Sequence, residues 1–212
     1  YRELPEGIAS VTYGSDNYYR ALLADSVNAG PGIATFALEY NYYDGPWVQP
    51  DELQRWNGFF RYSVGDDADY ASITFMGSDV RWDATDQVPR RLIQDGTIDR
   101  FGFVDPSNGG TSHRYSVSFD TQKTGDHGVT RVSAYAGTYQ LDLYSNFTLS
   151  LSDPVHGDQF NQFDDRWFAG GFVSHEFQDL NFIGRETDLE VGLQTHHDWI
   201  DGVGLHLTEG RQ

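Results

Sequence analysis

The feature that most constrains the fold is an alternation of apolar and polar residues with a period of two, repeated along the chain. A strand points successive side chains to opposite faces of a sheet, so this period is typical of half-buried β-strands. Residues 32–47, GIATFALEYNYYDGPW, give one aromatic and aliphatic face and one small and polar face with Glu39 in its middle. The apolar face carries Phe36, Leu38, Tyr40 and Tyr42.

The same alternation predicts about nine strands, with a tenth starting near Val203. No helical crossover interrupts the series, so we expect an all-β fold, an antiparallel up-and-down meander of about 9–10 strands. The predicted strand pairs are residues 8–13 with 18–27, 33–42 with 54–64, 70–82 with 112–121, and 129–143 with 166–177.

The connections between the predicted strands alternate between short and long. NAGPG, GDDA, QKTGDHG and DLNFIGRE are short, whereas YDGPWVQPDELQ and residues 83–111 and 145–165 are long. Short turns on one side and long loops on the other are typical of transmembrane β-barrels, whose strands need roughly 9–11 residues. The pattern therefore favours a slice of a larger transmembrane β-barrel over a soluble antiparallel sandwich or jelly roll, in which the apolar face would line a core.

In such a barrel the two faces of each strand meet lipid and a hydrated lumen. We expect an outward, lipid-facing set that comprises Phe36, Leu38, Tyr40, Phe60, Tyr62, Val117, Phe119, Tyr139, Leu141, Val191 and Leu193. The residues expected on the concave side are Glu39, Arg61, Arg114, Ser116, Gln140, Glu190 and Gln194.

Charge and composition exclude several classes of protein. The formal net charge of −18 argues against nucleic acid or anionic membrane surfaces as partners, because phosphates would be repelled. Cysteine is absent, which excludes disulfide scaffolds and thiolate metal sites. No run of about 18 apolar residues predicts a membrane-spanning helix.

The chemically reactive residue types do not form a recognisable catalytic or metal-binding motif. His196-His197-Asp198 lacks a third spaced ligand, so we interpret it as the start of a polar loop near an outer strand end. Acidic loop residues at Asp153, Asp158 and Asp164-Asp165 offer oxygen ligands for Ca²⁺, but no calcium-loop pattern supports a site. No G-x-S-x-G elbow or phosphate-binding lysine is present, so we expect no enzymatic activity, cofactor or metal.

Several stretches in succession resemble the first part of the barrel of TonB-dependent outer-membrane receptors. They are DGPW at 44–47, RYSVGD at 61–66, RWDATDQVPRRLIQDGTIDRFGFVDPSNGG at 81–110, DLYSNFT at 142–148 and SDPVHGDQFNQFDDR at 152–166. The resemblance covers nearly the whole chain. It implies an outer-membrane transporter with a barrel of about 22 strands, an internal plug and a TonB box.

The chain departs from that family pattern in what it lacks. It contains no plug and no TonB box, and about ten strands do not complete such a barrel. The resemblance therefore implies one domain over residues 1–212, the barrel segment just after the plug. Its expected partners are a nutrient ligand such as a metal chelate, the TonB system through the plug, and outer-membrane lipid.

Because binding residues collect on long loops carried by a rigid wall, we expect ligand capture mainly on residues 83–111 and 145–165, with the lumen wall secondary. The alternative is that these loops only seal the mouth while the plug and other loops bind the ligand. The resemblance leaves the ligand open among siderophore-iron, haem, cobalamin, copper complexes and oligosaccharides. The expected contacts are Asp83, Arg90, Arg100, Phe101, Phe103, Asp158, Phe160 and Gln162. Pro89 and Gly96 predict a short helix at about 89–95, on which Arg90 and Arg91 either contact an anionic ligand or, as we favour, brace the loop against nearby acids. The alternative function is a secreted or surface all-β module that binds carbohydrate.

Overall fold

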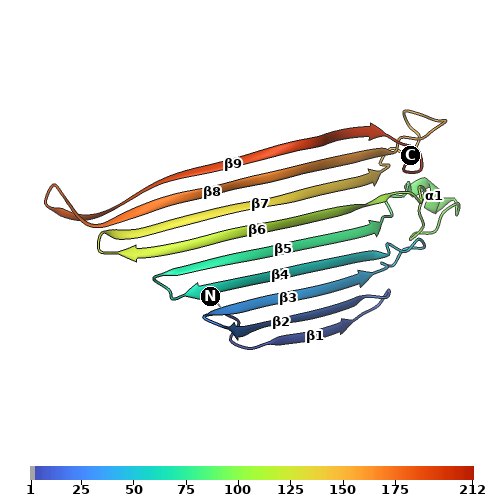
Figure 1. Ribbon diagram of the computed structural model, residues 1–212. Helices are drawn as coiled ribbons and strands as arrows, with labels where there is room; N and C mark the ends of the chain where they lie inside the picture. The colour runs from blue at the N-terminus through green and yellow to red at the C-terminus, as the bar shows by residue number, and fades with distance from the viewer. Residues whose placement is uncertain (1–2) are drawn as a thin grey trace.

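The computed structural model describes residues 3–212 as one open sheet of nine antiparallel strands, ordered as they occur in the chain (Figure 1). The predicted meander and all four predicted strand pairs are confirmed. The strands are β1 (Ile8–Tyr13), β2 (Tyr19–Ala29), β3 (Gly32–Tyr43), β4 (Leu53–Gly65), β5 (Tyr70–Asp83), β6 (Gly109–Gly125), β7 (Gly128–Ser145), β8 (Phe160–Phe182) and β9 (Arg185–Leu207).

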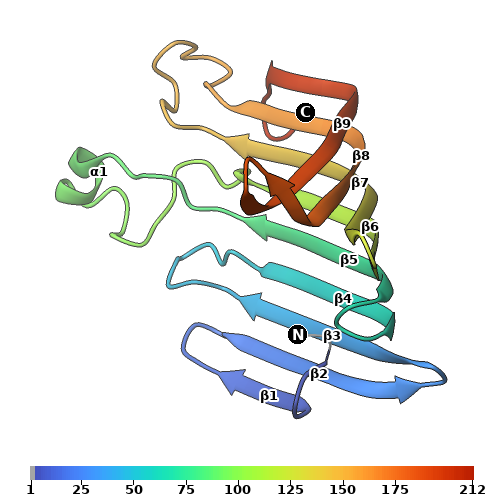
Figure 2. The ribbon, with the colours of Figure 1, turned by 90° about the vertical axis from the view of Figure 1, so that its left-hand side faces the viewer.

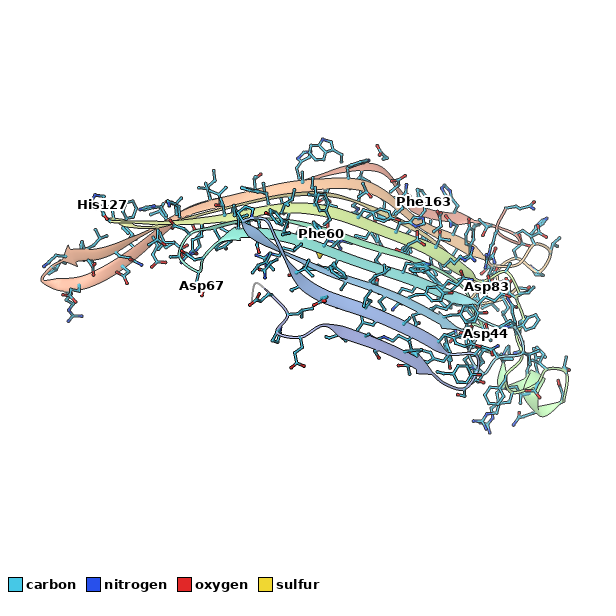
Figure 3. All side chains as sticks on the ribbon, turned by 60° about the horizontal axis from the view of Figure 1, so that its bottom comes forward. Asp44, Phe60, Asp67, Asp83, His127 and Phe163 are labelled. Carbon is cyan, nitrogen blue, oxygen red and sulfur yellow. The ribbon has the colours of Figure 1, made fainter. Side chains whose placement is uncertain are left out.

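The connections divide between the two ends of the sheet, as predicted. One end carries the short turns 30–31, 66–69, 126–127 and 183–184, and the other carries residues 14–18, 44–52, 84–108 and 146–159. We call these the short-turn end and the loop end. Figure 3 places Asp67 and His127 at the first and Asp44 and Asp83 at the second.

The strand boundaries correct two predictions, the tenth strand and the extent of the long loops. Val203 lies inside β9 and does not begin a tenth strand. The long loops are 84–108 and 146–159, shorter than expected, because ladder pairing continues past the polar residues at their edges. Strands β8 and β9 have 23 residues each, so their hairpin extends beyond the neighbouring turns (Figure 1).

The short helix α1 (Arg90–Gln94) lies in the loop between β5 and β6, close to its predicted position. Pro89 occupies the N-cap, and Gly96 adopts a φ of +79° just after the helix, a conformation that glycine reaches without strain. The helix projects away from the sheet at the loop end (Figure 2).

The described chain has almost no hydrophobic interior. Its accessible surface is 13798 Å², whereas a compact monomer of this mass would expose about 9,900 Å². Within residues 3–212 the buried hydrophobic residues are Ala24, Ala34, Val129 and Phe168. Among the described residues no second layer covers either face of the sheet.

The register sorts the two faces. Phe36, Phe60, Phe75 and Val117 are direct cross-strand neighbours and define what we call the apolar face. Glu39, Asn57, Ser78 and Arg114 are likewise neighbours and define the polar face. Most of the predicted face assignments are confirmed, from Phe36 on β3 to Leu193 on β9.

Strand β7 corrects the remaining assignments. Tyr139 pairs with Arg114 and therefore lies on the polar face, as does Leu141, whereas Gln140 lies on the apolar face. The two-residue turn 126–127 fixes this register by pairing Gly125 with Gly128. Gln140 pairs with His113 and Asp165, above the apolar middle of the sheet, so the polar side chain meets polar neighbours there.

Aromatic rings form a row across the apolar face on the side of the loop end. The contacts include Tyr13 with Tyr19 at 5.0 Å and Tyr40 with Trp56 at 4.5 Å between ring centroids. Further along, Trp167 is the direct cross-strand partner of Trp199. We call this set the aromatic row: Tyr13, Tyr19, Tyr40, Tyr42, Trp56, Tyr115, Trp167 and Trp199.

Candidate functional site

The loops at the loop end are joined by a buried polar network. Gln159 is 2 % exposed and Asn108 is 1 % exposed, and they are the largest fully buried side chains described. Gln159 donates from Nε2 to Ser107 Oγ at 2.6 Å and accepts at Oε1 from the backbone N–H of Arg211 at 2.9 Å. A single glutamine therefore holds the two long loops and the C-terminal segment together.

Arg211 completes this network from the far end of the chain. Its Nε donates to Ser107 O at 2.6 Å and its Nη2 donates to Asn108 O at 2.7 Å. Nη2 also donates to the carboxylate of Asp83, and the guanidinium lies 5.7 Å from the Tyr144 ring centroid. These contacts fix the ends of β5, β6, β7 and β8 relative to one another.

The third loop, 44–52, packs on the loop 84–108. Val48 N–H donates to Phe101 O at 2.9 Å, and the Trp47 and Phe101 rings lie 6.1 Å apart. Gln49 Nε2 donates to Pro106 O at 2.7 Å. The loop end is thus one connected surface built from three segments that are distant in sequence.

Asp51 lies at the base of this surface beside two other carboxylates. Burial raises the pKa of Asp51 to about 6; Asp44 and Asp83 add to the rise, and a hydrogen bond from Trp47 opposes it. The backbone connects the same residues, because Asp51 N–H donates to Asp44 O and Asp83 N–H donates to Asp51 O, both at 2.7 Å. The protonation of Asp51 is therefore coupled to the packing of loop 44–52.

Some of the predicted ligand contacts have exposed side chains, and others are engaged in contacts within the chain. Arg90 and Arg100 are exposed, and Phe101 is 43 % exposed. Hydrogen bonds from Thr97 lower the pKa of Asp95 and the nearby guanidinium of Arg91 adds to that effect, so the favoured interpretation of Arg90 and Arg91 as braces against nearby acids stays a prediction. Phe103 is partly buried in the same loop.

The other predicted contacts are held in place or lie outside the loops. Asp83 ends β5 and is bound to Arg211. Phe160 and Gln162 belong to β8 and not to a loop, although Phe160 contacts Phe147 at 5.6 Å. Asp158 accepts from Thr148 Oγ1 at 2.7 Å and from Asp153 N–H at 2.8 Å, and backbone hydrogen bonds led by Ser152 lower its pKa.

The acidic carboxylates of loop 146–159 accept hydrogen bonds from the backbone of the same loop. Backbone hydrogen bonds from His156 and Val155 lower the pKa of Asp153 to about 2, and the hydrogen bond to Asp153 raises the pKa of His156. Asp164 and Asp165 point to opposite faces of β8. Within residues 3–212 no cluster of His, Asp or Glu is arranged to hold a metal ion.

A second candidate site is a hollow of about 1030 Å³ on the polar face between β4 and β9. One wall is a chain of hydrogen bonds: Tyr135 OH lies 2.8 Å from His196 Nδ1, and His196 Nε2 lies 2.9 Å from Asp198 Oδ2. Arg166 Nη1 lies 3.8 Å from Asp198 Oδ1. His196 and His197 therefore lie inside β9 on opposite faces, and not at the start of a loop as expected.

Two glycines shape this hollow. A Cβ at Gly170 would lie 2.4 Å from Tyr135 Oη, and a Cβ at Gly137 would lie 2.5 Å from the Phe168 ring. Gly170 therefore lets Tyr135 of β7 cross β8 and reach His196 on β9. Gly137 lets Phe168 lie under the guanidinium of Arg114, whose Cζ is 5.1 Å from the ring centroid.

The residues that join the loops were not identified from the sequence. Gln159, Asn108 and Arg211 carry no motif, and their roles depend on side-chain contacts across 51 to 128 positions. The only signal is local: Gln159 and Asn108 each directly precede a strand. The hollow on the polar face was also not predicted from the sequence, because its residues come from six strands.

None of the helices among residues 3–212 has the length and apolarity needed to cross a membrane. No protein-family model, curated protein or solved structure matches the chain.

Proposed function

We propose that this chain is a wall segment of an outer-membrane receptor that takes up a nutrient by the TonB-dependent route. The observation that carries the proposal is the apolar face: an open meander exposes most of its large apolar side chains on one face, bounded by the aromatic row. Leu38, Phe60, Phe75 and Trp167 are between 41 % and 57 % exposed on that face. In water such a surface would promote aggregation, whereas lipid is a compatible neighbour.

The position of the loops supports the same orientation. In outer-membrane barrels short turns face the periplasm and long loops face outward. Here the long loops lie at the end that carries the aromatic row, and Tyr and Trp are enriched where a membrane meets water. The loop end would then face outward and present the proposed ligand contacts Arg90, Arg100 and Phe101.

The two edge strands support a larger parent structure. Strands β1 and β9 each have one unpaired edge, and β9 has 23 residues. Lipid does not tolerate unpaired backbone, so a membrane-embedded sheet continues into further strands until it closes. TonB-dependent receptors, which the chain resembles, have a closed barrel, an internal plug and a TonB box for energy coupling, so the proposal assigns these parts to the parent receptor.

The exposed arginines in loop 84–108 favour an anionic ligand. Arg90, Arg91 and Arg100 place three exposed guanidinium groups in one loop of a chain of net charge −18, where they would attract a carboxylate or phenolate of a metal chelate. The alternative, a soluble module that binds carbohydrate, would require a second layer over the apolar face.

The test uses the intact gene product in a Gram-negative host that lacks its own receptors for ferric siderophores, haem and cobalamin. The proposal predicts recovery of the protein in the outer-membrane fraction and growth on one of these nutrients only when TonB is present. Replacing Arg90, Arg91 and Arg100 by Ala should weaken uptake, whereas the matched control Arg185→Ala at the short-turn end should not. A protein found in soluble fractions, or uptake independent of TonB, would refute the proposal.

A further inference from the structure

A groove crosses the apolar face where two glycines stand opposite each other. Gly58 on β4 is the direct cross-strand partner of Gly77 on β5. The groove has a volume of about 690 Å³. Its raised borders are Leu38, Phe60, Phe75, Tyr115, Val117 and Trp167.

The glycines create the groove by omitting side chains from an otherwise aromatic surface. A Cβ built at Gly58 meets no heavy atom within 4 Å, and one at Gly77 meets only the Tyr115 ring, at 3.1 Å. Glycine weakens a strand interior, so its use twice in one cross-strand pair calls for a local reason. Space for a bound apolar group is such a reason.

The groove has a polar end on the side of the loop end. Asp79 follows Gly77 on the same face and is matched by His113, whose Nδ1 lies 2.7 Å from its Oδ2. Tyr115 OH donates to the same carboxylate at 3.3 Å. Two residues further, Arg81 donates from Nη2 to Gln54 Oε1 at 2.8 Å and forms no ion pair with a carboxylate of the described chain.

The two ends are close enough for one extended acyl chain to reach from one to the other. Arg81 lies four residues beyond Gly77, about 13 Å along the strand. A neutral hydrogen-bond partner leaves the Arg81 charge available, at the level where the aromatic row marks the edge of the apolar surface. An anionic group at Arg81 would therefore extend an apolar tail toward the groove.

We propose that the Gly58–Gly77 groove binds one acyl chain of an anionic phospholipid whose phosphate contacts Arg81. This inference rests on the proposed function, because it requires the apolar face to meet lipid. A peptide fits less well, since both edges of β4, β5 and β6 are already hydrogen bonded within the sheet and offer it no backbone partners. An acyl chain needs no such partners.

The test places a fluorescent reporter at the groove. In the intact gene product every tryptophan except Trp167 is replaced by Phe, Trp47, Trp56, Trp82 and Trp199 among them, so that Trp167 at the groove border is the only indole. The intact receptor is refolded in detergent micelles that contain small fractions of phosphatidylglycerol or phosphatidylcholine with brominated acyl chains. Bromine quenches Trp167 only in near contact. Half-maximal quenching should need about a threefold lower fraction of phosphatidylglycerol than of phosphatidylcholine, the effect expected from one exposed charge contact.

Two variants and two matched controls separate the groove from general lipid contact. Gly58→Leu should abolish the low-fraction quenching because it fills the groove, whereas Gly125→Leu, whose Cβ also meets nothing within 4 Å, should leave it unchanged. Arg81→Gln should remove the preference for phosphatidylglycerol. Arg55→Gln, the same change on the neighbouring strand and the polar face, should keep it.

The outcomes distinguish this inference from the proposed function. Equal quenching by both lipids in all variants, with the chain still associated with bilayers in flotation, would overturn the groove and leave the proposed orientation intact. An intact receptor that does not associate with bilayers would overturn both. Inorganic phosphate that competes as well as the lipid would overturn the acyl-chain assignment and leave only an anion contact at Arg81.

Discussion

The guanidinium of Arg211 donates a hydrogen bond to the carboxylate of Asp83, joining residues 128 positions apart. Through this contact the segment after β9 holds the end of β5, and its neighbours Ser107 and Asn108 bring the loop 84–108 with it. The proposed ligand surface is therefore held by a residue that does not itself face a ligand.

Replacing Arg211 with Ala should loosen the loop 84–108 without unfolding the sheet. The lost hydrogen bonds to Asp83 and two carbonyls predict local destabilisation of about 1–2 kcal/mol, because the guanidinium is partly exposed. Amide hydrogen exchange of residues 84–108 should become roughly 5- to 30-fold faster. Arg185→Ala serves as the control, and exchange that is equal in both variants would contradict the role of Arg211.

The raised pKa of Asp51 predicts that the stability of the fold at the base of loop 44–52 depends on pH. The pKa of Asp51 is about 6 in the folded chain and about 3.9 when unfolded, so the folded state binds more protons between these values. The contribution of Asp51 to stability should therefore fall as pH rises from about 4 to about 6 and then stay constant.

The measurement follows Trp47 emission in denaturant titrations at pH 4.5 and pH 7, since Trp47 hydrogen bonds to Asp51. Asp51→Asn keeps an acceptor but cannot ionise, so it should be more stable than the parent chain at pH 7 and less dependent on pH. The same slope in both chains would assign the pH dependence to other groups.

Gly170 is predicted to be essential for the contact between Tyr135 and His196. A methyl group there would lie 2.4 Å from Tyr135 Oη and 2.5 Å from Thr195 O, so either the ring or the ladder must shift. Gly170→Ala should cost about 1–3 kcal/mol, as overpacking does. That methyl group would also lie 2.6 Å from Tyr135 Cζ, so Tyr135→Ala/Gly170→Ala should lose less than the sum of the single changes if the clash lies with the ring. Additive costs would place the clash on the backbone of β9.

If the apolar face meets lipid, placing Arg at Phe60 should destabilise the protein much more than placing Arg at its neighbour Phe59. Phe60→Arg should cost about 2–4 kcal/mol of stability in bilayers if Phe60 lies near the membrane midplane. Phe59→Arg, one residue earlier on the polar face, should cost much less because its side chain reaches water. Reversible folding of the intact receptor into vesicles measures both, and equal costs would count against a membrane-spanning sheet.

Sequence patterns predicted the meander because alternation, turn residues and loop lengths are local properties. The pairing of Phe36 with Phe60 follows once the strands are known, since sequence neighbours pair in a meander. The face of Tyr139 was predicted wrongly because the register of β7 depends on its turn at 126–127 and not on its own hydrophobic pattern.

The candidate site was less predictable, since its organisation depends on contacts between distant segments. Asp158 matches a ligand contact by its type and its loop, yet its carboxylate oxygens accept hydrogen bonds from Thr148, Ser152 and Asp153. Gln159 is the centre of the loop network and carries no charge or motif. Arg90 and Arg100 lie where predicted because a proline, a glycine and a long loop define their surroundings locally.

The central claim, that the apolar face meets lipid and the polar face meets water, is tested most directly by spin-label accessibility along three paired strands. The chain has no cysteine, so single cysteines carrying a nitroxide can replace Phe59 and Phe60, Met76 and Phe75, and Ser116 and Val117 in turn. In bilayers, labels at 60, 75 and 117 should collide mainly with oxygen, and labels at 59, 76 and 116 mainly with a water-soluble nickel chelate. Nickel access that is equal on both faces would contradict the account.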